Sequence, residues 1–317
     1  MIIKLKSVIK DYIWGGTRLR DEFGKSSDCE RLAESWELSC HPDGLSVIDG
    51  GRFDGMTLDE FLRRDPKAMT QNCADYKEFP ILIKLIDARD NLSVQVHPDN
   101  DYARKVEGDN GKTEMWYVLD CEPDSSIICG FKEKITKSQF RRSIEDNTFM
   151  EKLNVVPVKK GDVFLIEPGT LHAIGKGILI AEIQQSSNVT YRVYDYGRVG
   201  NDGKPRMLHI GKALDVTKLE QPTGILGQPE HFKLPDSDAE YFPLCSCEYF
   251  SVSRYDVDGE FSAENPNVFL HILVIDGEAD ISGTPVNKGS SVFVPAGTDT
   301  INIKGKCSII LTRLNKI

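Results

Sequence analysis

Four side chains of the kinds that bind divalent metals stand out in the N-terminal part of the chain. Gln95 and His97 lie two positions apart in the run Leu-Ser-Val-Gln-Val-His. Glu114 precedes the apolar run Met-Trp-Tyr-Val-Leu, and His172 follows Pro-Gly-Thr-Leu. Two imidazoles, a carboxylate and an amide oxygen suit a borderline divalent ion such as Zn²⁺, and they leave a position for water or substrate. The sequence therefore predicts a metal site.

A histidine next to Pro-Asp is also common as an ordinary turn residue, which is the alternative explanation for His97. The chain contains this tripeptide at His41 as well as at His97. His97 differs because it ends an alternating run in which Gln95 lies two positions earlier, and alternate residues of a strand point to the same face. We expect His209 and His231, which lack ligand spacing, to lie on the surface or in the core.

The segments that must position these side chains are short and mostly extended. Runs with period-two alternation predict strands, and they lie at residues 79–86, 92–97, 115–119, 163–166 and 178–183. Helical spacing predicts short helices, and they lie at residues 57–64, 138–153 and 207–219. Because strands are many and helices few, the sequence favours a sandwich or barrel over a doubly wound sheet.

The chain divides into two predicted domains. Residues 218–242 are rich in Pro, Gly, Gln and Asp, which is typical of a linker. Strand patterns resume after it. We therefore predict a catalytic, metal-binding β-domain with helical segments at 1–240 and a second β-domain at 241–317.

The second domain resembles a degraded copy of the first. The segment that ends at His172 recurs, with the same glycine and threonine spacing, in the segment that ends at Thr300. In the same alignment Leu270 stands in place of Glu114. We therefore predict that the second barrel is degenerate and has no metal ligands, and this loss strengthens the metal interpretation of the first copy.

Longer motifs surround the candidate ligands and extend to the N-terminus. They are Leu-Ser-Val-Gln-Val-His-Pro-Asp-Asn ending at Asn100, Lys-Thr-Glu-Met-Trp-Tyr from Lys112, Pro-Gly-Thr-Leu-His-Ala-Ile-Gly from Pro168, Glu-Ile-Gln-Gln-Ser-Ser-Asn-Val-Thr-Tyr-Arg from Glu182, Lys-Asp-Tyr-Ile-Trp-Gly-Gly from Lys10 and Ala-Glu-Ser-Trp-Glu from Ala33. Over at least residues 8–200 the chain resembles the short bacterial branch of type I mannose-6-phosphate isomerases, zinc enzymes of the cupin superfamily. The resemblance implies a mainly β fold of two cupin (jelly-roll β-barrel) domains with a few short helices.

The resemblance also implies roles for individual residues. The implied zinc ligands, for one Zn²⁺ per chain, are Gln95, His97, Glu114 and His172. The implied catalytic residues are Arg192, Lys112 and Glu182. The implied substrate-binding residues are Trp14, Glu34, Lys84, Ser93 and Arg198, of which the last two match positions that contact the substrate phosphate. Lys84 also lies inside an apolar run, where an inward lysine needs an anionic partner or substrate.

The implied reaction interconverts D-mannose 6-phosphate and D-fructose 6-phosphate through an enediol(ate), whose negative charge must be stabilised. Zinc as a Lewis acid and the guanidinium of Arg192 would supply that stabilisation. The proton carrier stays open among Lys112, Glu182 and a zinc-bound water. The alternative function is a non-enzymatic sugar-binding or regulatory bicupin. A cupin dioxygenase is disfavoured, because it would prefer more histidine ligands, whereas one of the four candidate ligands here is Gln95.

Composition excludes other classes of function. The formal net charge is −10, from 39 Lys and Arg against 49 Asp and Glu. We expect no nucleic-acid partner, because such binding needs a basic surface. No apolar run approaches the roughly 18–20 residues that cross a bilayer, and the N-terminus lacks signal-peptide features. The eight cysteines form no Cys-x-x-Cys pair. We therefore expect a cytoplasmic monomer or homodimer that acts on a small phosphosugar and has no membrane partner.

Overall fold

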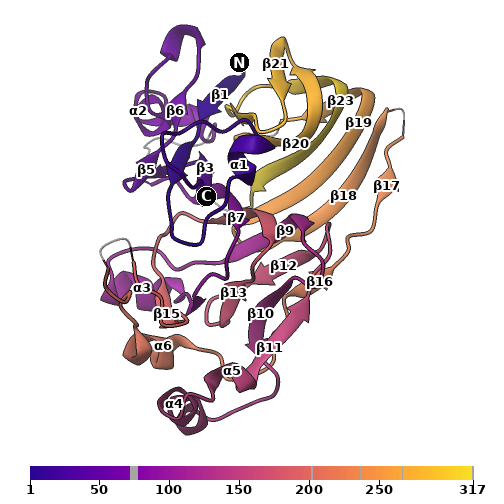
Figure 1. The fold of residues 1–317 in the computed structure, drawn as a ribbon. Coiled ribbons are helices and arrows are strands. Elements are labelled where there is room, and N and C mark those ends of the chain that lie inside the picture. The colour runs from indigo at the N-terminus through magenta and orange to yellow at the C-terminus, as the bar shows by residue number, and fades with distance from the viewer. Residues whose placement is uncertain (72–77, 201–202, 236, 266, 316–317) are drawn as a thin grey trace.

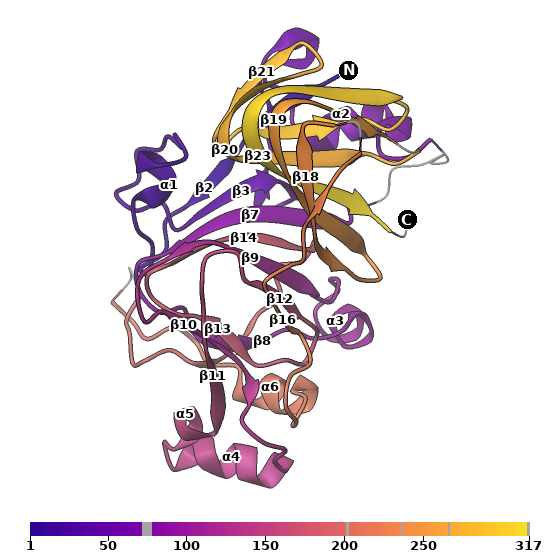
Figure 2. The same ribbon diagram turned by 90° about the vertical axis from the view of Figure 1, so that its right-hand side faces the viewer.

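Three β-sheets form stacked layers in the computed structural model (Figures 1 and 2). It describes residues 1–71, 78–200, 203–235, 237–265 and 267–315. A central sheet lies between a small sheet, which helices cover from below in Figure 2, and a C-terminal sheet above it. The mainly β, cupin-type architecture is as predicted.

The middle strands of the central sheet are buried on both faces. Its strands, in spatial order, are β16 (Ile225–Gly227), β12 (Val163–Ile166), β9 (Glu114–Cys121), β14 (Ile178–Gln185), β7 (Ile81–Ala88), β3 (Glu34–Leu38) and β2 (Val8–Lys10), all antiparallel. Strands β7 and β14 are buried along their whole lengths. This burial explains their nearly continuous apolar sequences, since alternation appears only where one face of a sheet meets water.

The small sheet packs one face on the central sheet and the other on helices. Its strands, in spatial order, are β11 (Leu153–Pro157), β10 (Ser126–Phe131), β13 (His172–Ile174), β8 (Val94–Val96) and β15 (Tyr191–Tyr194). Val94 and Val96 join the apolar cluster of the helices, which includes Phe140 and Leu214. Because side chains alternate along a strand, Gln95 points the opposite way, toward the central sheet.

The helices are short. In the described residues they are α1 (Arg18–Asp21), α2 (Leu58–Arg64), α3 (Asn100–Val106), α4 (Lys137–Glu145), α5 (Phe149–Lys152) and α6 (Ile210–Val216), with 3₁₀ turns η1 (Gly51–Phe53) and η2 (Pro66–Ala68). Thr57 caps α2 by accepting a hydrogen bond from the amide of Glu60 at 3.1 Å. The prediction of a single helix at 138–153 is wrong in one respect, because this segment forms two helices. Asn147 adopts a φ of 57° and separates α4 from α5.

The C-terminal sheet includes two strands from the start of the chain. Its strands, in spatial order, are β17 (Phe232–Lys233), β18 (Ala239–Ser246), β19 (Phe250–Glu264), β23 (Thr300–Leu314), β20 (Leu270–Ile281), β22 (Ser291–Val294), β1 (Ile3–Lys6) and β6 (Val47–Ile48), and β21 (Thr284–Asn287) also pairs with β20. A separate hairpin joins β4 (Cys40–His41) to β5 (Gly44–Leu45). The pairing of β1 with β22 ties the two predicted domains together. The boundary at residue 240 and the degeneracy of the second barrel stay predictions.

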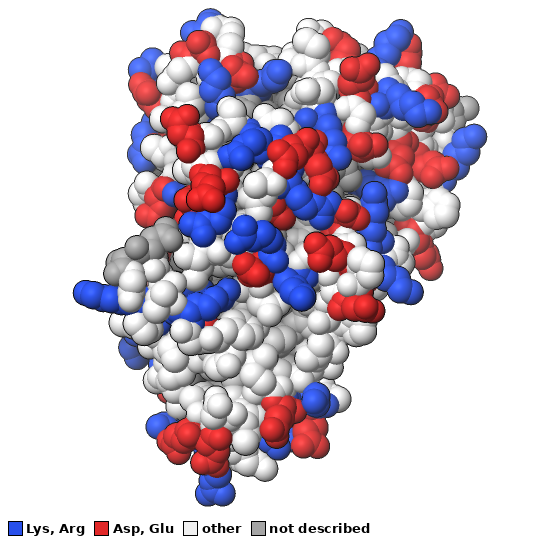
Figure 3. Space-filling model, viewed as in Figure 1, with Lys and Arg blue, Asp and Glu red and all other residues white. Residues whose placement is uncertain are grey.

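Acidic and basic side chains are mixed over the face of the molecule shown in Figure 3. Most of the charge on that face lies over the upper part of the molecule, whereas much of the lower part is uncharged. Within the described part of the chain, the helices are too short or too polar to span a bilayer.

A buried polar group joins the C-terminal sheet to the central sheet. His271 on β20 lies with its Nε2 2.9 Å from the hydroxyl of Ser291, which donates a hydrogen bond to the backbone carbonyl of Glu37. The Glu37 carboxylate is itself paired with Lys25 at 2.6 Å. Burial, together with the positive charge of Lys25, lowers the pKa of His271 to about 3. His271 is therefore neutral in the folded protein.

This buried histidine makes stability depend on pH. Below its ordinary pKa of about 6.5, the unfolded chain binds a proton that the folded chain does not. The associated stability is complete above that pH and is lost as the pH falls toward 3. Between pH 7 and pH 5 we expect the parent to lose about 2 kcal/mol more free energy of unfolding than His271→Gln, measured by denaturant titration. His231→Gln, at an exposed histidine, is the control, and equal losses in parent and His271→Gln would contradict the prediction.

Candidate metal centre and active site

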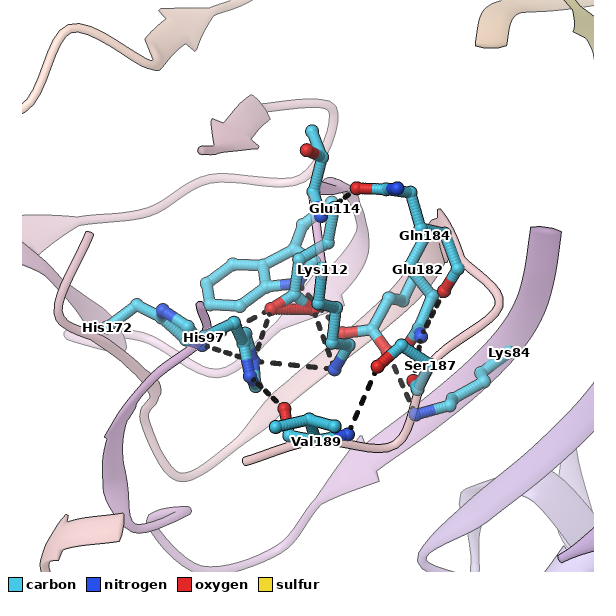
Figure 4. Close-up of polar contacts among 12 residues, drawn as sticks. Lys84, His97, Lys112, Glu114, His172, Glu182, Gln184, Ser187 and Val189 are labelled. Carbon is cyan, nitrogen blue, oxygen red and sulfur yellow. Dashed lines mark hydrogen bonds and ion pairs between the residues drawn. The ribbon is translucent and has the colours of Figure 1, made fainter. Parts of the chain in front are cut away.

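Three proton-accepting side chains converge between the small and the central sheets (Figure 4). His97 directly follows β8, Glu114 opens β9, and His172 opens β13. The Nε2 atoms of the two histidines are 3.1 Å apart, and each lies close to Oε1 of Glu114, at 2.9 Å for His97 and 3.2 Å for His172. All three side chains are almost fully buried. Among the described residues they form the one group of His, Cys, Asp and Glu that could hold a metal ion.

The outer ring nitrogens of both histidines face backbone carbonyls. His97 Nδ1 lies 2.7 Å from the carbonyl of Val189, and His172 Nδ1 lies 2.8 Å from the carbonyl of Thr170. Since a carbonyl can only accept, each Nδ1 carries a proton, which leaves Nε2 as the ring nitrogen that can bind a metal. Burial, together with the positive charge of Lys112, lowers the pKa of His97 to about 3, which keeps it neutral.

The carboxylate of Glu114 adds an anionic acceptor to the two imidazoles. Burial by itself would raise the pKa of Glu114, but the charge of Lys112 and the contacts with His97 and His172 hold it well below its usual range. Neither carboxylate oxygen has a hydrogen-bond donor among the described residues. Two imidazole lone pairs and an anionic oxygen within 3.2 Å of one another repel unless a cation lies between them. The residues therefore fit a divalent metal.

Gln95 extends this cluster into a row across the small sheet. It is paired with His172 on β13 and with Arg192 on β15. Gln95 and Arg192 both line a cavity of about 300 Å³. The cavity therefore adjoins the metal cluster. Of the other sequence-predicted site residues, those that line it are Trp14, Glu34, Lys84, Ser93, Lys112 and Glu182.

A row of charged side chains on the central sheet faces the cavity. Lys84 Nζ lies 3.1 Å from Glu182 and 3.6 Å from Glu34. Burial alone would lower the pKa of Lys84, but the carboxylates of Glu34 and Glu182 raise it. Trp116 donates a hydrogen bond from Nε1 to Glu182 at 3.0 Å. The buried lysine thus has the anionic partners that its position in an apolar run requires.

Lys112 and Glu182 both border Glu114. Lys112 Nζ lies 3.4 Å from Glu114 Oε2 and 3.4 Å from His97 Nε2 (Figure 4). Burial, followed by the negative charge of Glu114, raises the pKa of Glu182. Both side chains therefore lie where the cavity meets the metal cluster.

The segment that carries Lys112 and Glu114 is held by a chain of hydrogen bonds. The amide of Thr113 donates to Gln185 Oε1 at 2.9 Å, and Gln185 Nε2 donates to Asn100 Oδ1 at 3.2 Å. Asn100 then donates to the Tyr249 hydroxyl at 3.0 Å, which lies in the turn between β18 and β19. The C-terminal sheet thus contacts the active-site segment through a side chain that the sequence did not single out.

Sequence reasoning missed several residues of the cavity. Those are Tyr12, Asn188, Thr190, Arg206 and His209. His209 was expected on the surface or in the core, but its Nδ1 accepts a hydrogen bond from the amide of Arg192 at 3.2 Å. His209 lies seventeen residues beyond Arg192, where the last of the quoted motifs ends, and no motif marked it. Arg198, in contrast, does not line the cavity and is paired with Asp195 at 2.6 Å.

Known proteins resemble the chain over its whole length. The family profile "Phosphomannose isomerase type I, catalytic domain" matches residues 2–134, and "Mannose-6-phosphate isomerase, cupin domain" matches residues 239–314. The mannose-6-phosphate isomerase ManA of Bacillus subtilis is 40% identical, with 98% of each chain covered. A crystal structure of the mannose 6-phosphate isomerase from Bacillus subtilis has a TM-score of 0.91 at 35% identity, covering 98% of this chain and 99% of that one. A mannose 6-phosphate isomerase bound with zinc and yttrium shares the fold, with a TM-score of 0.75 at 18% identity over 99% of this chain and all of that one.

The acceptor cluster predicts a tightly bound divalent ion. We expect the purified parent to contain about one equivalent of metal by elemental analysis, and Glu114→Ala to lose it, since the carboxylate is the anionic ligand. A chelator should lower the melting temperature of the parent but not that of Glu114→Ala. Glu34→Gln, which removes a cavity carboxylate outside the cluster, is the control and should keep the ion. Full metal content in Glu114→Ala would contradict the assignment.

Proposed function

The chain belongs to the type I mannose-6-phosphate isomerase family, and we propose that it interconverts D-mannose 6-phosphate and D-fructose 6-phosphate in the cavity beside the His97–Glu114–His172 cluster. The observation that carries this proposal is the convergence of three buried acceptors next to a pocket lined with cationic side chains. Relatives named as isomerases cover 98% of the chain, which favours this activity over a sugar-binding bicupin without catalysis. The predicted cytoplasmic location and the monomeric or homodimeric state belong to the same proposal.

We propose Zn²⁺ as the ion of this site, one per chain. Two imidazoles and a carboxylate are a common zinc donor set. Gln95 is paired with His172 across the small sheet and lines the adjoining cavity, so we assign its amide oxygen as the fourth ligand. Bound there, zinc would act as a Lewis acid on the C1 and C2 oxygens of the sugar.

The isomerisation moves a proton between C1 and C2 and produces an enediol(ate)-like charge on the neighbouring oxygens. Arg192, on the row that holds Gln95 and His172, is placed to stabilise that charge. Its own side-chain partners are the neutral Ser93 hydroxyl and the carbonyl of Met207, so its positive charge is not neutralised locally.

The proton carriers of this proposal are Lys112 and Glu182. Both line the cavity at its border with the metal cluster, and both are buried, which excludes bulk water from the transfer. Lys84 is a poorer carrier, because two carboxylates hold its proton. We assign Trp14, Glu34, Lys84 and Ser93 to substrate binding, since all four line the same cavity.

The activity itself gives the first test. A coupled assay that detects fructose 6-phosphate should show turnover of mannose 6-phosphate by the purified parent. Treatment with a chelator should abolish the activity, and added Zn²⁺ should restore it. A metal-loaded, folded parent without turnover would refute the proposed function.

Substitution of Arg192 should affect catalysis without affecting metal binding. We expect Arg192→Ala to keep its metal and to lose about 10²–10³-fold in kcat, the usual effect of removing a donor to a developing oxyanion. Lys218→Ala removes an exposed cation that does not line this cavity and should leave kcat unchanged. Turnover by metal-loaded Arg192→Ala at the parental rate would show that the charge-stabilising role is wrong.

A further inference from the structure

We propose that Arg206 binds the substrate phosphate, and that Arg198 has the structural role of holding the loop beside it. The inference rests on the proposed function, because it identifies which side chain recognises the phosphate of that substrate. Each arginine side chain has the same exposed fraction, 21%, and each pairs with Asp195. Exposure therefore does not distinguish them, but their partners do.

All three guanidinium nitrogens of Arg198 have acceptors within the protein. Nη2 donates to Asp195 Oδ1 at 2.6 Å, Nε donates to the backbone carbonyl of Asp195 at 3.3 Å, and Nη1 donates to the carbonyl of Asn91. These bonds join the loop after β15 to the loop before β8. A phosphate could engage Arg198 fully only by displacing acceptors that already satisfy it.

Arg206 keeps one side of its guanidinium available. Its Nε donates to Asp195 Oδ2 at 2.7 Å and its Nη2 donates to Asp195 Oδ1 at 2.5 Å, which fixes the plane of the group. No acceptor for its Nη1 occurs among the described residues, and Arg206 lines the cavity whereas Arg198 does not. A guanidinium that lines a cavity, is fixed by a carboxylate and keeps one nitrogen without a protein acceptor is suited to an oxyanion.

The charges around Asp195 leave a positive excess at this end of the cavity. Two guanidinium groups, those of Arg198 and Arg206, share the carboxylate of Asp195. Among the described residues, the nearby guanidinium of Arg192 is hydrogen-bonded only to Ser93 and to the carbonyl of Met207. Burial and then the positive charge of Arg206 lower the pKa of Arg192, which indicates that the two cations lie close together. A sugar phosphate carries about −1.5 to −2 at neutral pH, which matches the excess of two positive charges.

Ser93 borders the same part of the cavity. Its hydroxyl accepts a hydrogen bond from Arg192 Nε at 3.3 Å, and its O–H can then donate to a phosphate oxygen. Ser93, Arg192 and Arg206 all line the cavity, whereas Lys84 and Lys112 occupy its border with the buried carboxylates. The cavity thus has a metal end and a phosphate end, with Arg192 between them beside Gln95, and Arg206 belongs to the second.

The test compares Arg206→Gln with Arg198→Gln, which removes a cation from the same carboxylate. We measure KM and kcat for mannose 6-phosphate, and we measure the binding of inorganic phosphate by calorimetry. Arg206→Gln should raise KM and the Kd of phosphate at least about tenfold, while kcat changes by less than about threefold. Arg198→Gln should lower the melting temperature more and change both constants less. Arg206→Lys, which keeps the charge but not the planar fork, should give intermediate values and replaces Arg206→Gln if that variant does not fold.

Failure of this inference is distinguishable from failure of the proposed function. A parent that binds phosphate through Arg206 but does not turn over mannose 6-phosphate would overturn the function and leave the anion site supported. A folded, active Arg206→Gln with parental KM and phosphate affinity would overturn the site and leave the function intact. Larger losses of phosphate affinity in Arg198→Gln than in Arg206→Gln would also overturn it.

Discussion

The structure depends on bringing three proton acceptors to one point inside a protein. His97, Glu114 and His172 lie within 3.2 Å of one another and almost without access to water. The nearest cation, the ammonium of Lys112, lies beside the cluster, 3.4 Å from His97 and from Glu114. Lone pairs and an anion at such distances repel strongly in a medium of low polarity. The surrounding scaffold must therefore supply enough binding energy to hold the site together and enough rigidity to prevent its acceptors from turning away toward water.

The layered fold supplies that rigidity. The three residues of the cluster project from the ends of strands in two facing sheets. The contact between Trp116 on β9 and the ring of His172, with centroids 5.5 Å apart, shows how closely those sheets approach. A carbonyl behind each histidine fixes its orientation. The third layer contributes as well, because Tyr249 reaches the segment of Glu114 through Asn100 and Gln185. A second barrel without metal ligands would still stabilise the catalytic one by covering its outer face.

A feature could be predicted from the sequence where it depends on neighbouring residues, and not where it depends on tertiary packing. Gln95 and His97 share a face because strand geometry is local, and Lys84 needed a buried anion because its neighbours are apolar. The pairing of β1 with β22 could not be predicted, since hydrophobic alternation does not specify which strands become neighbours. His209 and Arg206 were missed for a related reason, because they come from a loop whose path depends on tertiary packing rather than on a periodic pattern.

We infer from Arg198 and Arg206 that residue type alone does not identify a ligand. It and Arg206 have the same chemistry and the same carboxylate partner, but the backbone carbonyls of Asn91 and Asp195 satisfy only Arg198. A cation binds substrate according to the hydrogen-bond capacity that its protein partners leave unused. The same reasoning reconciles a chain of net charge −10 with an anionic substrate. Overall charge affects solubility and long-range encounter, whereas recognition depends on the few cations whose counter-charges inside the protein are incomplete.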